Sequence, residues 1–302
     1  MTTSPKPVTV YCGELCKSQE CNTATLNLLN RSLNGIEPNI SIGYEKFVNN
    51  PESLSPRIID LLQVAAHIFC ADRMISRGKR GSVDNKSWAR TIEFHLPVID
   101  IDFWSSPALQ VALSQCLQFM TGDRKYSFVF KEANVKLHVP RQLSLFTEEM
   151  SLVAGADTAD VMLLSGGLDS LAGAIEYLNE HSDRNLITVT HKANHSVKRT
   201  QESIVGDLQS RYDNRLIPYG FECHNKKIIG SIEETQRTRM FLFSAIAYAI
   251  CDCFGKHQFY VHENGITSIN LQGQGDVINA RASRTTHPKT MCLIKNFLRV
   301  FT

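Results

Sequence analysis

The sequence predicts an α/β protein in which a parallel-sheet domain, residues 151–302, follows a smaller α+β domain, residues 1–150. A chain of 302 residues has about the length of two domains. In the second half, short apolar runs alternate regularly with helical patterns, which is typical of βαβ units and a parallel sheet. The first half mixes strand and helix patterns without that alternation, and the acidic, small-residue stretch 147–157 separates the halves.

Strands and helices are both expected in the first half. Apolar residues recur three and four positions apart over residues 56–74 and 107–120, which predicts helices, and Pro56 suits a helix start. The expected strands are residues 8–11, 39–44, 88–95 and 126–131. No chemical motif lies in these segments, so partner docking is the candidate role for this half.

The second half alternates strand and helix more clearly. The expected strands are residues 160–164, 185–190, 215–221 and 259–263, and the expected helices are residues 169–178, 196–212 and 237–253. The last helix is apolar nearly all round, which indicates burial in a core or an interface. Because ligands of parallel sheets bind beyond the carboxyl ends of the strands, the residues that follow each strand are the site candidates.

Composition and charge exclude several classes of protein. With 43% apolar and 21% charged residues the chain is globular, and its net charge of +2 gives no global attraction for nucleic acid. The N-terminus lacks the pattern of a secretory leader, and the longest apolar stretch, 241–254, is too short to span a bilayer. Nine cysteines without a leader indicate a cytoplasmic protein with free thiols. Cys12, Cys16 and Cys21 lack CxxC spacing, so zinc is not favoured there.

A short glycine-containing segment follows the first strand of the second half, and we call it the glycine loop. Its residues are Ser165, Gly166, Gly167, Leu168, Asp169 and Ser170. Adjacent glycines let backbone N–H groups approach an anion, and the N-terminus of the following helix favours negative charge at the same place. The serine hydroxyls can add donors, and Asp169 can cap the helix or help to hold a phosphate-bound metal ion. The segment is neither a Walker A loop nor a dinucleotide fingerprint.

This segment, SGGLDS between a strand and a helix, resembles the pyrophosphate loop of the PP-loop ATP pyrophosphatases. Members of that superfamily cleave ATP between the α and β phosphates and leave an adenylated substrate. The resemblance implies an adenine nucleotide alpha hydrolase-like, Rossmann-like domain in which all six residues of the glycine loop, together with Thr190, bind ATP. It also implies that Mg²⁺ offsets the phosphate charge, without assigning the metal ligands.

Later segments are similar to those of the QueC-like branch, the 7-cyano-7-deazaguanine synthases. His195 matches a histidine of that branch, and the helix that begins near Arg237 and Arg239 resembles its long helix. Residues 263–266 and 283–288 are similar to QueC-like proteins of bacterial anti-phage systems, the QatC type, which carry an extra N-terminal domain. The resemblance covers roughly residues 155–290.

The resemblance implies two sets of residues beyond the nucleotide loop. The catalytic set is Asp169, Ser170, His195 and Arg237. The substrate-binding set is Arg239, Glu263, Asn264, Gly265, Thr286 and His287. For the histidines the alternative is a hydrogen bond within a loop, for the arginines a role in capping the apolar helix, and for Glu263 a plain charge at a strand end.

One departure from the branch concerns zinc. Housekeeping QueC ends with a four-cysteine zinc site, whereas this chain has only Cys292 after Pro288. Either the zinc site is lost or its segment is missing at the C-terminus, so zinc remains an open alternative.

The expected function is an ATP-dependent C–N ligase, with an AMP-forming or ADP-forming step left open. It would adenylate a 7-carboxy-7-deazaguanine-like carboxylate and form an amide or nitrile with ammonia, an amine or a partner-protein amine, in anti-phage defence. The expected partners are this small molecule and a protein of the same defence operon, whereas tRNA and membranes are not favoured. The alternatives are a PP-loop tRNA-modifying enzyme and a nucleotide-binding assembly or sensing subunit of a defence complex.

Overall fold

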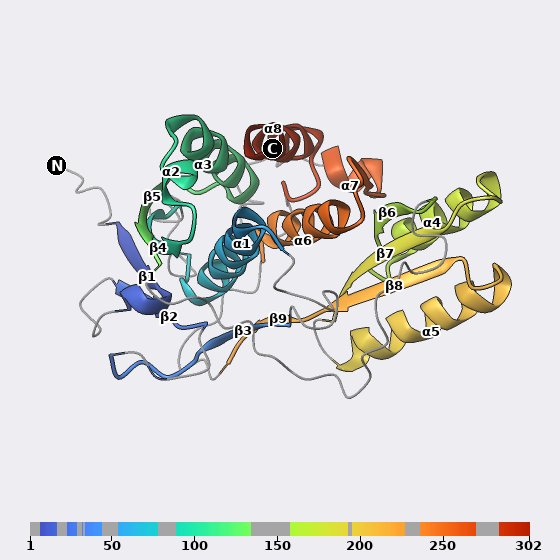
Figure 1. The fold of residues 1–302 in the computed structure, drawn as a ribbon, viewed down its shortest axis with the longest axis horizontal. Helices are drawn as coiled ribbons and strands as arrows, with labels where there is room; N and C mark the ends of the chain where they lie inside the picture. The colour runs from blue at the N-terminus through green and yellow to red at the C-terminus, as the bar shows by residue number, and fades with distance from the viewer. Residues whose placement is uncertain are drawn as a thin grey trace.

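The computed structural model describes the chain in segments. These are residues 7–16, 23–28, 32, 34–43, 54–77, 89–133, 158–192, 195–226, 236–269 and 284–302. Within them, no helix has the length and apolar character needed to cross a membrane. The architecture is α/β, with one four-stranded parallel sheet in each half of the chain (Figure 1).

The first half of the chain forms a parallel sheet with the strand order β2-β1-β4-β5. Its strands are β1 (Val8–Cys12), β2 (Thr23–Leu26), β4 (Thr91–Val98) and β5 (Lys125–Glu132). Its helices are the short 3-10 helix η1 (Gly13–Leu15), α1 (Pro56–Met74), α2 (Ile101–Trp104) and α3 (Pro107–Thr121). The expectation of an α+β domain was therefore wrong, because all three strand pairs of this sheet are parallel.

The second half forms a parallel sheet with the order β10-β6-β7-β8. Its strands are β6 (Asp160–Leu163), β7 (Leu186–His191), β8 (Leu216–Phe221) and β10 (Phe259–Tyr260). Its helices are α4 (Leu168–Glu180), α5 (His195–Arg211), α6 (Arg239–Cys253), α7 (Gly265–Ile269) and α8 (Pro288–Phe301). The Rossmann-like expectation is compatible with this parallel arrangement.

Three helices of the second half, α4, α5 and α6, cover opposite faces of this sheet. Met162 of β6 packs with Tyr177 of α4 and Leu208 of α5, so α4 and α5 share one face. The neighbouring residue Val161 lies in the other core cluster, together with Phe241 of α6. The chain passes from β6 to β7 and β8 on one side and then returns through α6 to β10 on the other. The strand order therefore reverses at β6, and such a reversal opens a crevice at the carboxyl ends of the strands.

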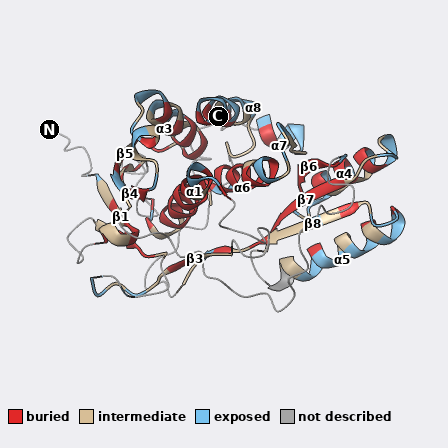
Figure 2. Cartoon of the chain, viewed as in Figure 1, coloured by how far each residue is buried: buried red, intermediate tan, exposed pale blue. Residues whose placement is uncertain are grey.

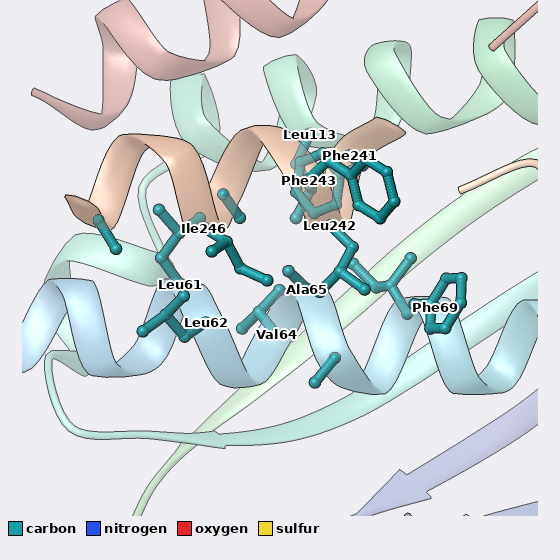
Figure 3. Packing of buried hydrophobic residues seen from close by; sticks show 14 of the residues in the cluster. Leu61, Leu62, Val64, Ala65, Phe69, Leu113, Phe241, Leu242, Phe243 and Ile246 are labelled. Atoms are coloured by element: carbon teal, nitrogen blue, oxygen red, sulfur yellow. The ribbon is translucent and has the colours of Figure 1, made fainter. Parts of the chain in front are cut away.

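The two halves share one apolar core. Helices α1 and α6 lie side by side between the two sheets and are buried along most of their length (Figures 1 and 2). Figure 3 shows part of this shared core, to which Leu61, Leu62, Val64, Ala65 and Phe69 of α1 and Phe241, Leu242, Phe243 and Ile246 of α6 belong. The halves are also joined by a small antiparallel sheet of β3 (Ile40–Ile42) and β9 (Cys223–Asn225).

A buried charge cluster, Asp72, Arg77, Arg90 and Asp123, lies beside the start of α6. Arg77 pairs with Asp72 at 2.9 Å and with Asp123 at 2.7 Å, while Arg90 donates to the same two carboxylates. All four side chains are at most 4% exposed. Asp72 also accepts the backbone N–H of Thr238 at 3.1 Å and its hydroxyl at 3.3 Å. The end of α1 thereby holds the first turn of α6 in place.

Candidate functional site

The glycine loop lies where the strand order of the second sheet reverses. It follows β6 directly and leads into α4, whose N-cap residue is Gly167. The N-cap glycine has no side chain to cap this helix start, and within the described residues no side chain accepts the N–H groups of Leu168, Asp169 or Ser170, so these groups are available to an external acceptor. Leu168 is 79% exposed, so it can serve a ligand through its backbone N–H, while its side chain points into solvent. An uncapped start of a 13-residue helix at a strand-order reversal favours an anion.

The two serines of the loop fold it back on itself. The Ser165 hydroxyl oxygen accepts the N–H of Gly167 at 3.2 Å, and the Ser170 hydroxyl oxygen accepts the N–H of Ser165 at 3.2 Å. The Ser170 hydroxyl donates to the Gly167 carbonyl at 3.0 Å and lies 3.0 Å from the Ser165 hydroxyl. Ser170 is buried and Ser165 is exposed. Ser170 thus stabilises the loop from within, and Ser165 is the serine that faces solvent.

Gln201 of α5, which sequence reasoning missed, holds the loop from the other side. Its Nε2 donates to the Ser165 carbonyl at 2.9 Å and to the His191 carbonyl at 3.2 Å. Gly166 has a φ of +86°, and a Cβ at this position would lie 2.9 Å from Cγ of Gln201. A sequence signal was present, because Gln201 falls on the apolar stripe of its helix between Val197 and Leu208. A polar residue on such a stripe indicates a buried partner.

Three charged side chains from separate elements gather beside the loop. Asp169 lies in the first turn of α4, Arg239 is the first residue of α6, and Glu263 follows β10. Partial withdrawal from water raises the pKa of the Glu263 carboxyl, the charge of Arg239 opposes that rise, and the charge of Asp169 adds to it. The structure therefore brings together members of the predicted nucleotide-binding, catalytic and substrate-binding sets.

Other residues at the strand ends are buried. Thr190 is 4% exposed, and its hydroxyl has no hydrogen-bond partner within the described part of the chain. His191 lies among the rings of Phe69, Phe221 and Phe243. Burial lowers the pKa of His191 to about 4, so its ring is neutral at physiological pH. His195 is the first residue of α5, and its side chain lies outside the described residues.

The two arginines at the start of α6 have different surroundings. Arg237 is 6% exposed and approaches the Thr121 carbonyl at 3.5 Å, next to the buried charge cluster. Arg239 is exposed, with its guanidinium 5.1 Å from the centre of the Phe243 ring. Of the two, Arg239 is the one that a ligand in solution can reach.

The remaining predicted residues lie around α7 and α8. Gly265 begins α7, and the Asn264 carbonyl accepts the Ser268 N–H at 2.9 Å. The Ser268 hydroxyl in turn donates to the Thr286 hydroxyl at 3.1 Å. His287 caps α8, where its Nδ1 accepts the backbone N–H of Lys289 at 3.0 Å. Thr286 is thus linked to the segment after β10, whereas His287 has a structural partner.

Metal binding depends on few candidate ligands. Across the described segments, no three His, Cys, Asp or Glu side chains are grouped to hold a metal ion. Cys12 and Cys16 are buried, and burial raises the pKa of the Cys16 thiol to about 11, whereas zinc binds thiolates. Cys21 lies outside the described residues. Asp169 and Glu263 are hard oxygen donors of the kind that Mg²⁺ takes in small number alongside phosphate oxygens and water.

Comparison of the chain with protein-family models, curated proteins and solved structures returned no match.

Proposed function

We propose that this chain binds ATP through its phosphates at the glycine loop and uses it to activate a carboxylate, as an ATP-dependent C–N ligase of the QueC-like type. The observation that carries the proposal is the uncapped start of α4 behind a positive-φ glycine, at the reversal of strand order. This arrangement presents backbone donors to an anion without needing a lysine, which suits a pyrophosphate group.

The neighbouring charges suit the same reaction. In the proposed step, a substrate carboxylate oxygen attacks the α phosphorus, the bond to the bridging oxygen breaks, and pyrophosphate leaves with the electron pair. An amine then attacks the acyl carbon and displaces AMP. Backbone N–H groups at the start of α4 hold the leaving pyrophosphate, and Arg239 supports the charge that develops at the phosphates. A bound Mg²⁺ would offset phosphate charge, and Asp169 of the loop would be one of its ligands.

The substrate assignment rests on the resemblance of the later segments. Glu263 and Asn264 follow β10 on the side of the crevice opposite the β7 end. A carboxylate and an amide there can accept and donate to the edge of a purine-like ring. On this basis the proposed substrate is a 7-carboxy-7-deazaguanine-like acid, and the acceptor is ammonia or an amine of a partner in a defence system.

The test is release of pyrophosphate and AMP from ATP with Mg²⁺, with and without 7-carboxy-7-deazaguanine. We expect acid-dependent release of both products. Asp169→Asn should reduce that release on the order of 10²-fold, because it removes a charge that the phosphate-bound metal needs. The matched control is Glu176→Gln, an exposed carboxylate further along the same helix, which should keep nearly full activity. Equal activity of wild type and Asp169→Asn would contradict the role of Asp169.

A second candidate is a nucleotide-binding subunit with little turnover. It is favoured by the surroundings of His191 and His287, since one is buried and neutral and the other caps α8. Neither is placed to move a proton at the loop. Tight ATP binding without pyrophosphate release, across a set of acids and amines, would support this candidate over the ligase.

A further inference from the structure

We infer that Gln201 is a positioning residue that sets the conformation of the glycine loop. The inference deepens the proposed function, on which its ligand-binding part rests. Gln201 belongs to α5, outside the loop and outside the strand ends that contain the predicted site residues. It is 2% exposed, so it acts on a ligand only through the backbone that it holds.

Gln201 completes the hydrogen bonding at the end of the β6–β7 pair. The backbone bond from Leu164 N–H to the Val189 carbonyl, 2.9 Å long, is followed by two carbonyl groups, those of Ser165 and His191. Two carbonyl oxygens cannot pair with each other, because both are acceptors. The amide nitrogen of Gln201 carries two hydrogens and donates to both oxygens, at 2.9 and 3.2 Å. It therefore joins the strand ends at the point where the loop leaves the sheet.

Gln201 also packs against the turn at Gly166. The chain turns at Gly166 with a φ of +86°, and Cγ of Gln201 stands 2.9 Å from the place where a Cβ would be. The glutamine stem thus packs directly on the turn that its amide group holds. A longer or branched side chain at residue 166 would be excluded by this contact as well as by the backbone conformation.

A glutamine is an unusual residue at this buried position of α5. Position 201 lies on the apolar stripe of α5, where a leucine or methionine would ordinarily pack. Burying an amide group is unfavourable unless it is hydrogen-bonded, and Oε1 of Gln201 has no partner in the described segments. The hydrogen bonds from Nε2 to the two carbonyl groups therefore offset the cost of burying a glutamine at this position.

The experiment compares Gln201→Met with Gln209→Met. Gln209 lies on the same helix, and its Nε2 donates to the Leu216 carbonyl at 3.2 Å, at the start of β8 and away from the loop. Both variants keep side-chain length and remove a bond from glutamine to a backbone carbonyl. The readouts are amide hydrogen exchange of Ser165 and Gly167, whose N–H groups are hydrogen-bonded within the loop, and calorimetric affinity for inorganic pyrophosphate and for ATP.

We expect Gln201→Met to speed exchange in the loop and to weaken pyrophosphate affinity, each by about tenfold or more. Gln209→Met should leave both within about twofold of wild type. Loop exchange and affinity in Gln201→Met that match Gln209→Met would overturn the inference. Wild-type protein that binds neither pyrophosphate nor ATP would overturn the proposed function, and the exchange comparison would then decide the inference alone.

A second variant keeps the test decisive if Gln201→Met does not fold. In Gln201→Glu the protonated carboxyl can still donate one O–H to a carbonyl, whereas the ionised form repels both carbonyl oxygens. Burial and these oxygens raise the pKa of the introduced carboxyl. Pyrophosphate affinity relative to wild type at the same pH should therefore rise as the pH falls. A ratio that does not change with pH would count against the inference.

Discussion

At the residue scale, the buried histidines carry a consequence for stability. His191 lies among aromatic rings, and its Nε2 donates to the Cys223 carbonyl at 3.3 Å. His67 of α1 is 1% exposed. Burial lowers the pKa of each ring to about 4 from a usual value of 6.5. Since the unfolded chain binds these protons more readily, their contribution to stability is present above pH 6.5 and is lost as the pH falls toward 4.

The prediction concerns His191→Phe, which suits an aromatic surrounding and cannot titrate. Between pH 7 and pH 4.5, the variant should lose about 2 kcal/mol less unfolding free energy than wild type. Urea unfolding at a series of pH values measures this difference. Burial raises the pKa of Asp60 to about 6, so the contribution of Asp60 to the unfolding free energy changes with pH in the opposite direction. This contribution is the same in both proteins and cancels in the comparison. The control is His257→Gln at an exposed position, and a pH dependence of His191→Phe equal to wild type would contradict the prediction.

Much of the candidate site could be predicted at the level of single residues. The glycine loop was readable because its residue types suit an anion and because strand, loop and helix follow one another in the chain. Gln201 could not be assigned a partner, since its contact with Ser165 joins positions 36 residues apart. The difference between Arg237 and Arg239 was also out of reach, because both lie at the same helix start and only tertiary packing buries the first.

At the scale of elements, α6 depends on the end of α1. Asp72 accepts the Thr238 N–H and pairs with Arg77 and Arg90 in a fully buried setting. Arg239 follows directly and faces solvent at the candidate site. The first half of the chain therefore places a charged residue of the second half.

The corresponding prediction is that Asp72→Asn lowers the unfolding free energy by about 3 kcal/mol, because two buried guanidinium groups lose a counter-charge. Asp100→Asn is the matched control, since Asp100 also pairs with an arginine, Arg57 at 2.8 Å, and also accepts a backbone N–H, that of Phe103. The Asp100–Arg57 pair is partly exposed, so Asp100→Asn should lower the unfolding free energy by less than about 1 kcal/mol. Denaturant unfolding measures the unfolding free energy of both variants. Equal losses in Asp72→Asn and Asp100→Asn would contradict the prediction.

Most of the long helices were predictable from the sequence, whereas several short elements were not. The helix predicted over residues 56–74 was confirmed as α1, with Pro56 at its first turn and Ser55 as a capping side chain. The strand predicted over residues 259–263 is only β10, Phe259–Tyr260, since pairing with β6 ends there. The sequence analysis missed β2, β9 and α7, which are too short for a periodic pattern and exist through tertiary pairing.

At the scale of the whole molecule, the division of the chain at residue 150 does not divide the core. Apolar residues of α1 and α3 and those of α6 and α8 belong to one cluster. The ring of Phe301, at the end of α8, lies 5.2 Å from Phe103 and 5.8 Å from Trp104, two residues of the first half. The near-uniform apolar character of residues 237–253 indicated burial from the sequence, but the partner helix became apparent only in the structure.

This shared core predicts the behaviour of a fragment comprising residues 151–302. Without the first half, the apolar face of α6 that meets α1 would be exposed, including Leu242 and Ile246 (Figure 3). The start of α6 would lose Asp72, and β9 would lose its pairing with β3. A helix apolar all round has no stable position at a protein surface, so the fragment should lack a cooperative unfolding transition and any affinity for pyrophosphate. Circular dichroism melting and calorimetry test this.

Co-expression of the fragment with residues 1–150 should restore both properties, because the missing contacts are non-covalent. A fragment that melts cooperatively and binds pyrophosphate as the full chain does would mean that the second half folds independently and that the first half serves partners alone.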